Sequence, residues 1–146
     1  MATPNVSVVL VSHGEMAPGM LNSVQMLLGP QENMVAYSIY PEQPKETLIE
    51  KLQAEVNEYG AENIIFMTEL KFGTPFNCVV ELTREHDIYH ITGTNLATLM
   101  TVVTERDDGA SLDAICEAAM ETAMESIADV RVMLSAEADL EEEEDL

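Results

Sequence analysis

The chain has 146 residues and carries 27 acidic against 6 basic side chains, which gives a formal net charge of −21 at pH 7. A chain of this length forms one domain that buries roughly two thirds of the surface its unfolded form exposes. The negative charge repels phosphate backbones and anionic lipids, so we expect no nucleic-acid partner. No apolar stretch approaches the roughly 20 residues that span a bilayer.

The N-terminal half predicts two strand–helix units. Residues 6–11 form an apolar, β-branched run that is typical of a buried parallel strand, and residues 34–40 form the second strand. Apolar stripes at helical spacing comprise Ala17, Met20, Leu21, Val24 and Leu28 in the first helix and Leu48, Leu52, Val56 and Tyr59 in the second. We expect these helices to end at Gly29-Pro30 and at Gly60.

The C-terminal half predicts two more strands, residues 63–68 and 88–92, with helices that start near Thr74, Leu96 and Ser111. Thr74 is the expected N-cap of its helix, because the following proline fits a first-turn position that needs no N–H donor. Strands and helices therefore alternate along the chain. This order predicts an α/β fold with a doubly wound, mainly parallel sheet covered on both faces.

The helix after Ser111 carries an apolar stripe that comprises Leu112, Ile115, Ala119, Ala123 and Ile127. Met120 and Met124 flank the stripe, and we interpret them as packing residues rather than as a binding surface. Residues 130–134 are predicted to form a short final strand. The last ten residues hold seven acids and no base, which predicts one domain (residues 1–136) and a disordered acidic tail (residues 137–146). The alternative is a tail that attracts a basic partner.

Cys78 and Cys116 lie far apart without metal-ligand spacing, and the N-terminus lacks the basic region and apolar core of a signal peptide. We therefore expect a cytoplasmic protein with reduced thiols, and both cysteines are interpreted as small hydrophobic residues inside helices. The sequence contains no nucleophile elbow, Walker loop or dinucleotide fingerprint. We expect neither a metal nor a cofactor.

Two polar side chains follow apolar strands, since His13 comes after the first strand and Glu69 after the third. Open α/β folds bind ligands at the carboxyl edge of the sheet, and Glu69 would face His13 there if these strands are neighbours. A histidine can accept a phosphoryl group on one ring nitrogen when an acceptor fixes the proton on the other. Gly73 permits a tight turn, while the hydroxyls of Ser12 and Thr74 and a helix N-terminus offer donors to an anion.

Each of these signals has an ordinary structural interpretation as well. A histidine after a strand is more often structural or simply exposed, and a carboxylate in that position is commonly only solvated. His86 lies on a polar connection and His90 within a strand, so we expect neither to be catalytic.

Several segments resemble the IIA component of the mannose-family phosphotransferase system. They are Ser12-His13-Gly14, residues 23–34, residues 46–51, residues 73–77, residues 93–99 and residues 106–108, and the similarity extends over about residues 5–134. The resemblance implies a doubly wound sheet of four parallel strands and a fifth, antiparallel strand exchanged between the subunits of a homodimer. Residues 130–134 match that fifth strand.

The resemblance also implies roles for the site residues. His13 matches the histidine that takes phosphate on Nε2 from the histidine-containing phosphocarrier protein and passes it to a histidine of a IIB component. Glu69 matches the carboxylate that accepts a hydrogen bond from the other ring nitrogen, and Ser12 and Thr74 match hydroxyls beside the phosphate. The IIB component links such a protein indirectly to membrane IIC and IID components.

The chain departs from the family pattern in the turn after Glu69. Many members have aspartate before Trp-Gly-Gly-Ser-Pro, whereas this chain has the longer glutamate, one glycine fewer and an added cation, Lys71. Lys71 either balances phosphate charge or is only solvated. Two other functions stay open, namely a phosphotransfer subunit for dihydroxyacetone kinase and a non-enzymatic module that binds a small anion. The sequence does not identify the sugar.

Overall fold

The computed structural model describes residues 5–145 and contains one parallel sheet with the strand order β2–β1–β3–β4. Its strands are β1 (Ser7–His13), β2 (Met34–Ile39), β3 (Ile64–Thr68) and β4 (Tyr89–Ile91). The predicted α/β fold with a doubly wound parallel sheet is confirmed. All four strands lie close to their predicted ranges.

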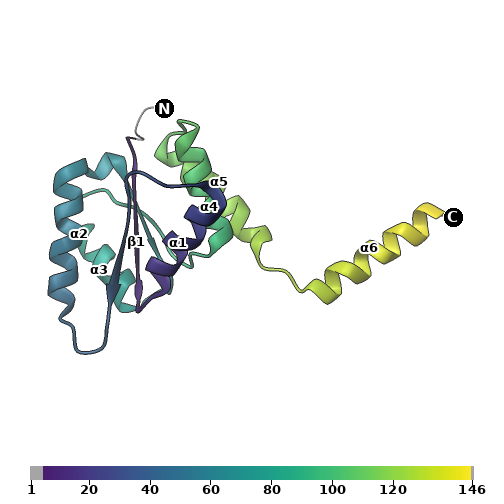
Figure 1. Cartoon of the computed structure of the whole chain (residues 1–146), viewed down its shortest axis with the longest axis horizontal. Coiled ribbons are helices and arrows are strands. Elements are labelled where there is room, and N and C mark those ends of the chain that lie inside the picture. Colours follow the sequence, from purple (N-terminus) through teal and green to yellow (C-terminus); the bar gives the residue numbers. More distant parts are fainter. Residues whose placement is uncertain (1–4, 146) are drawn as a thin grey trace.

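Helices cover both faces of this sheet. The covering helices are α1 (Met16–Leu28), α2 (Lys45–Tyr59), α3 (Thr74–Leu82), α4 (Leu96–Asp107) and α5 (Leu112–Ser126). A short 3₁₀ helix, η1 (Ala61–Asn63), precedes β3, and a last helix, α6 (Val130–Asp145), follows α5. Figure 1 shows α2 and α3 on one side of the sheet and α1, α4 and α5 on the other. Within residues 5–145, we find no helix with the length and hydropathy that crossing a bilayer requires.

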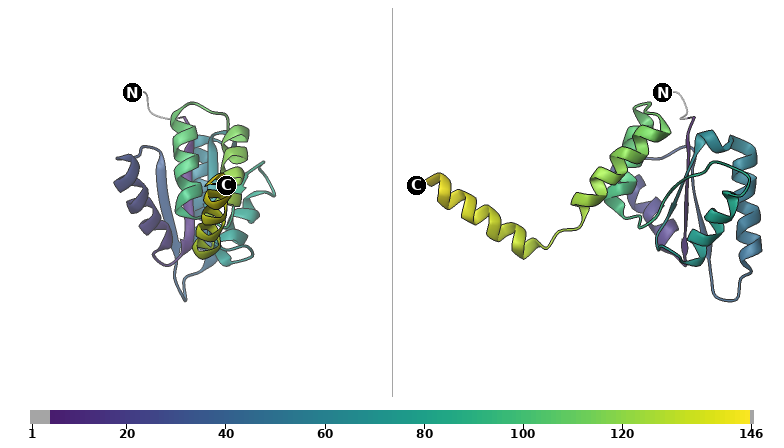
Figure 2. Two further views of the ribbon diagram at one scale, coloured as in Figure 1. Left: turned by 90° about the vertical axis from the view of Figure 1, so that its right-hand side faces the viewer. Right: turned by 180° about the vertical axis from the view of Figure 1, so that it is seen from behind.

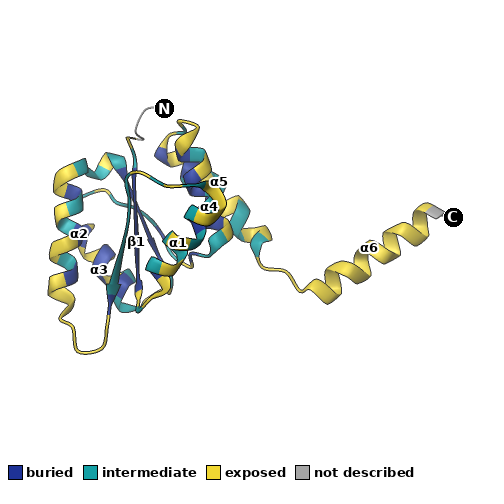
Figure 3. Ribbon diagram, in the orientation of Figure 1, coloured by how far each residue is buried: buried dark blue, intermediate teal, exposed yellow. Residues whose placement is uncertain are grey.

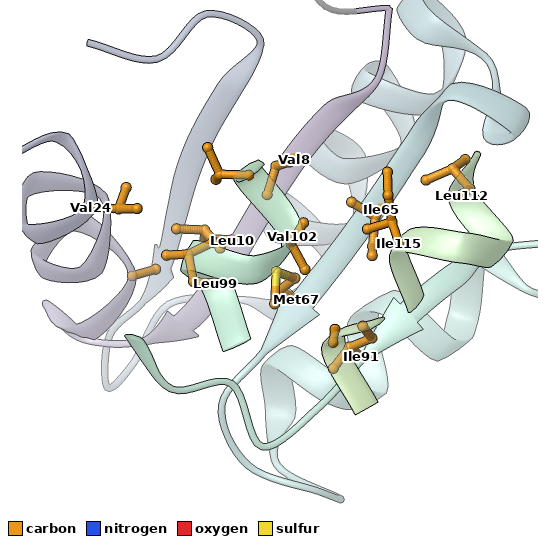
Figure 4. Close-up of a cluster of buried hydrophobic side chains, with 13 residues drawn as sticks. Val8, Leu10, Val24, Ile65, Met67, Ile91, Leu99, Val102, Leu112 and Ile115 are labelled. Carbon is orange, nitrogen blue, oxygen red and sulfur yellow. The ribbon is translucent and has the colours of Figure 1, made fainter. Parts of the chain in front are cut away.

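Alternate side chains of the central strand β1 enter two separate cores. Val8 and Leu10 pack with buried residues of α1, α4 and α5, as Figure 4 shows, whereas Val9 and Val11 pack with buried residues of α2 and α3. Successive side chains of a strand point to opposite faces, and here both faces are covered by helices. The unbroken apolar run in the sequence follows from this double burial.

The C-terminal part differs from the sequence prediction. Residues 130–134 begin α6 instead of forming a strand. We expected residues 137–146 to be disordered, but residues 137–145 continue the same helix, and residue 146 lies outside the described residues. Figures 1 and 2 show α6 projecting away from the body of the fold, and Figure 3 shows it exposed along its length. A strand needs a neighbouring strand for its backbone hydrogen bonds, whereas a helix makes them within itself. In the single chain, residues 130–134 therefore make their backbone hydrogen bonds by forming a helix.

The apolar stripe of α5 is buried only in its first half. Leu112, Ile115 and Ala119 pack in the core, but Ile127 lies beyond the end of the helix and is exposed. The prediction that Met120 and Met124 are packing residues is wrong for the single chain, because both are exposed and Met124 by 87%. The helix still contacts the body of the fold beyond Met120, because the Thr122 hydroxyl lies 2.8 Å from that of Thr101 and Ser126 accepts a hydrogen bond from Asn95, so the two methionines lie on its outward side.

Candidate functional site

The site lies at the carboxyl ends of β1 and β3, which are neighbours in the sheet. The register pairs Val11 of β1 with Thr68 of β3, so His13 and Glu69 leave the sheet side by side. The condition under which we expected Glu69 to face His13, namely that the first and third strands are neighbours, is therefore met. Chemistry at this edge is typical of open parallel sheets.

The Glu69 carboxylate holds His13 through two hydrogen bonds. Oε1 lies 2.7 Å from Nδ1 of the imidazole, and Oε2 accepts the backbone N–H of His13 at 2.9 Å. Because a carboxylate offers only acceptors, this contact places the ring proton on Nδ1 and leaves the lone pair of Nε2 free. The His13 side chain is 49% exposed and that of Glu69 10%, so the ring is reachable from solvent while its partner is held.

The turn before α3 packs directly against the imidazole. A Cβ atom added to Gly73 would lie 2.9 Å from Cε1 of His13 and 3.2 Å from the carbonyl oxygen of Leu70. Cε1 joins the two ring nitrogens, so the approach restricts the ring beside the reactive atom. Glycine is required here by the closeness of the ring and not by backbone conformation, since its φ is −72°.

We expect Gly73→Ala to lower the rate of phosphoryl transfer to His13 on the order of tenfold or more, because the new methyl group displaces the ring from its position against Glu69. The rate of phosphorylation and the thermal unfolding midpoint measure the effect. Gly19→Ala in α1 is the matched control, since nothing lies within 4 Å of its added Cβ. Equal transfer rates for both variants would contradict the assigned role of Gly73.

Gly73, rather than Thr74, is the N-cap of α3. Thr74 is the first helical residue, Pro75 is the second, and the cap involves no side-chain hydrogen bond. The predicted cap is therefore wrong by one position, because the turn needs its smallest residue next to His13. Thr74 instead lines a cavity of about 520 Å³ together with His13. The unpaired N–H groups of a helix start favour an anion at this place.

The same cavity is bounded by the connection from β2 to α2, which sequence reasoning did not connect with the site. Lys45, the first residue of α2, and Tyr40 both line it. The Tyr40 hydroxyl donates a hydrogen bond to the Glu15 carboxylate, and this bond raises the pKa of the tyrosine. This connection lies near His13 because β1 and β2 pair in parallel, with His13 opposite Ile39. No local sequence motif indicates that it belongs to the site.

Ser12 is not brought to the other site residues. Its side chain is fully buried, and its hydroxyl oxygen accepts the backbone N–H of Ala17 at 2.7 Å. Neighbouring residues of a strand point to opposite faces, so Ser12 faces α1 while His13 faces the side of α2 and α3. The hydroxyl therefore supports the start of α1 and lies away from the face that carries the imidazole.

The other two histidines and Lys71 each contact a side chain of another residue type in the fold. His90 Nε2 lies 2.8 Å from the Thr68 hydroxyl, and burial lowers the pKa of this histidine to about 4, which keeps it neutral at pH 7. His86 Nε2 lies 3.3 Å from the Gln53 amide nitrogen. The Lys71 ammonium lies 5.2 Å from the centre of the Phe72 ring. Within residues 5–145, no three His, Cys, Asp or Glu side chains gather as metal ligands.

Known proteins resemble this chain over most of its length. The family model described as "PTS system fructose IIA component" matches residues 7–120. The mannose-specific EIIAB component of Escherichia coli K12 is 32% identical over 124 residues, a match that covers 84% of this chain and 38% of the relative. The fructose-specific EIIA component of Bacillus subtilis is 25% identical, over 70% of this chain and 71% of the relative.

Solved structures resemble it as well. The crystal structure of a phosphotransferase system component EIIA from Streptococcus agalactiae superimposes with a TM-score of 0.80 at 28% identity, over 87% of this chain and 98% of that one. The chain spans less than half the length of the E. coli relative, whose full activity and partners therefore do not transfer directly. The family model covers well over half of the residues, and the E. coli match supports it independently, so the chain belongs to the EIIA-man family of phosphotransferase system IIA components.

Proposed function

We propose that this chain is a phosphocarrier in sugar uptake, which accepts a phosphoryl group on Nε2 of His13 from the histidine-containing phosphocarrier protein. It then passes the group to a histidine of a IIB component, which links it indirectly to membrane IIC and IID components. The observation that carries the proposal is the pair of hydrogen bonds from His13 to Glu69. They hold the imidazole in the tautomer whose Nε2 lone pair can attack phosphorus.

The proposed step exchanges one phosphorus–nitrogen bond for another. The Nε2 lone pair of His13 attacks the phosphorus of a donor phosphohistidine in line, and the bond to the donor nitrogen breaks with its electron pair. The imidazole of His13 becomes positively charged as it keeps its Nδ1 proton, and the Glu69 carboxylate offsets this charge. Little else than position and charge is required, because both ends of the transfer are imidazole nitrogens.

The surroundings of Nε2 suit the phosphoryl group that arrives there. Thr74 at the start of α3 and Lys45 at the start of α2 line the same cavity as His13. A hydroxyl, a cation and two helix starts all favour the negative charge of the phosphoryl group. Lys45 thus takes the role that the sequence suggested for Lys71, which contacts an aromatic ring instead. We keep Gly73 as part of the phosphate site and leave Ser12 out of it.

The test is phosphorylation of the full chain by phosphoenolpyruvate, enzyme I and the histidine-containing phosphocarrier protein, followed by mass analysis. We expect one acid-labile phosphoryl group per chain. An unmodified chain beside a positive control that accepts phosphate would overturn the proposal and leave the anion-binding module as the alternative. Onward transfer to a IIB protein, rather than to dihydroxyacetone kinase, distinguishes the two phosphotransfer functions.

We also propose that the chain is a homodimer. The end of α5 and the start of α6 expose apolar side chains in the single chain, among them Met124, Ile127, Val132 and Leu134. Exposed large apolar side chains in such number are typical of an interface, and a second copy would bury them. The acidic half of α6 lies beyond this segment and contributes repulsion instead.

We expect light scattering to find that the full chain is a dimer at micromolar concentration. A chain truncated after Asp129 should be a monomer, because this truncation removes the apolar start of α6. Truncation after Ala136 is the matched control, since it keeps the apolar start of α6 and removes residues 137–146, seven of which are acidic, and it should remain a dimer. A monomeric full-length chain, or a chain that ends at Asp129 and is still a dimer, would exclude this interface.

A further inference from the structure

The turn from Leu70 to Gly73 holds an aromatic residue in a conformation that favours glycine. The N–H of Gly73 donates to the carbonyl oxygen of Leu70 at 3.0 Å, which closes the turn, and Phe72 has a φ of +67° within it. Left-handed backbone is rare for bulky residues, because the Cβ atom crowds the neighbouring carbonyl group. A glycine at this position would adopt the turn without strain.

The Phe72 ring gains little from its own chain in this strained position. It is 71% exposed, and its ring contacts are the edge of Phe76 at 5.5 Å between centroids and the Lys71 ammonium at 5.2 Å. Leu70, at the other end of the turn, is 57% exposed. The turn therefore presents two large apolar side chains to solvent, and packing within the chain does not explain why Phe72 is there. Strained residues of this kind often lie at functional sites.

The turn is also next to the reactive ring. Gly73, the neighbour of Phe72, approaches Cε1 of His13 so closely that an added Cβ would lie 2.9 Å from it. A donor protein that transfers phosphate to Nε2 must place its own histidine against this edge of the sheet. The surface around the donor histidine then meets the turn, where a large aromatic side chain can provide an anchor.

We propose that Phe72, with Leu70 beside it, is the apolar docking anchor for the protein that donates the phosphoryl group to His13. This inference rests on the proposed function and adds the chemistry of the partner. Glu42 lines the cavity beside the acceptor histidine, Glu15 accepts a hydrogen bond from Tyr40 of the same lining, and the whole chain carries a net charge of −21. The donor surface that fits is an apolar patch with a rim of lysine and arginine around its phosphohistidine.

The test measures the initial rate of phosphorylation of the full chain against the concentration of the donor, the histidine-containing phosphocarrier protein. We expect Phe72→Gly to raise the KM for the donor about tenfold and to change kcat by less than about twofold, as the loss of a docking contact does. The same variant should unfold at an equal or higher temperature, because glycine relieves the strain. Phe72→Tyr keeps an aromatic anchor and should restore most of the affinity.

Met26→Ala is the control for the loss of an exposed apolar side chain, since Met26 is 88% exposed on α1 and does not line the cavity. Its KM should equal that of the wild type. If the wild type accepts phosphate but Phe72→Gly shows an unchanged KM, or a loss confined to kcat, the docking role is overturned. If the wild type accepts none, the proposed function has failed instead. A wild-type KM that does not rise with added salt would overturn the cationic rim.

Discussion

We expect the His13→Ala chain to accept no phosphoryl group under conditions in which the wild type is phosphorylated. The proposed acceptor is Nε2 of the imidazole, which the Glu69 carboxylate holds through Nδ1 beside the cavity that Thr74 also lines. The fold should survive the change, because the side chain is half exposed and the lost hydrogen bond to the carboxylate is worth about 2 kcal/mol. Mass analysis before and after acid treatment measures the phosphoryl group, and thermal unfolding measures the fold.

His86→Ala is the matched control, since it removes a histidine that contacts Gln53 and lies outside the residues that line the cavity. We expect this variant to be phosphorylated at the wild-type rate. If His13→Ala still accepts a phosphoryl group, the acceptor is another residue. The contact between Glu69 and His13 would then have no role in phosphoryl transfer. His90 is a poor second acceptor, because its Nε2 already contacts the buried Thr68 hydroxyl.

The long-range geometry of the site was predictable because strand order determines it. The apolar runs before His13 and Glu69 identify two buried parallel strands, and their pairing in the sheet brings both residues to one edge. The departure from aspartate to glutamate does not break the site, since the longer side chain still reaches Nδ1 at 2.7 Å. The local patterns thus predict that both residues leave the sheet at the same edge, while the contact across 56 positions also requires that β1 and β3 are neighbours, which the structure shows.

Details that depend on side-chain direction were not predictable in the same way. Ser12 adjoins His13 in sequence, yet the alternation of a strand turns its hydroxyl toward α1. Lys45 reaches the site only through the pairing of β1 with β2 and the course of the following connection. Residues 130–134 are too short a run for periodicity to separate strand from helix, and without a partner strand they continue as α6.

We expect Glu69→Gln to slow phosphoryl transfer on the order of 10²- to 10⁴-fold while the chain stays folded. The carboxylate accepts two hydrogen bonds at once, from the backbone N–H and from Nδ1 of His13. An amide replaces one of the two acceptor oxygens with an NH₂ group, so at the two positions that the carboxylate oxygens occupy it can accept only one of these two N–H groups. If its oxygen takes the backbone N–H, its NH₂ group faces Nδ1, and the ring proton moves to Nε2.

This change of tautomer removes the lone pair that attacks phosphorus, and the loss of charge leaves the phosphorylated imidazolium without its counterion. Nitrogen NMR of His13 should therefore find the proton on Nδ1 in the wild type and a larger Nε2–H population in Glu69→Gln. Glu69→Asp is the control, because it keeps both acceptors and the charge on a shorter side chain, and its transfer rate should lie above that of the glutamine variant. Wild-type rates in Glu69→Gln, with an unchanged tautomer, would show that another group orients the ring.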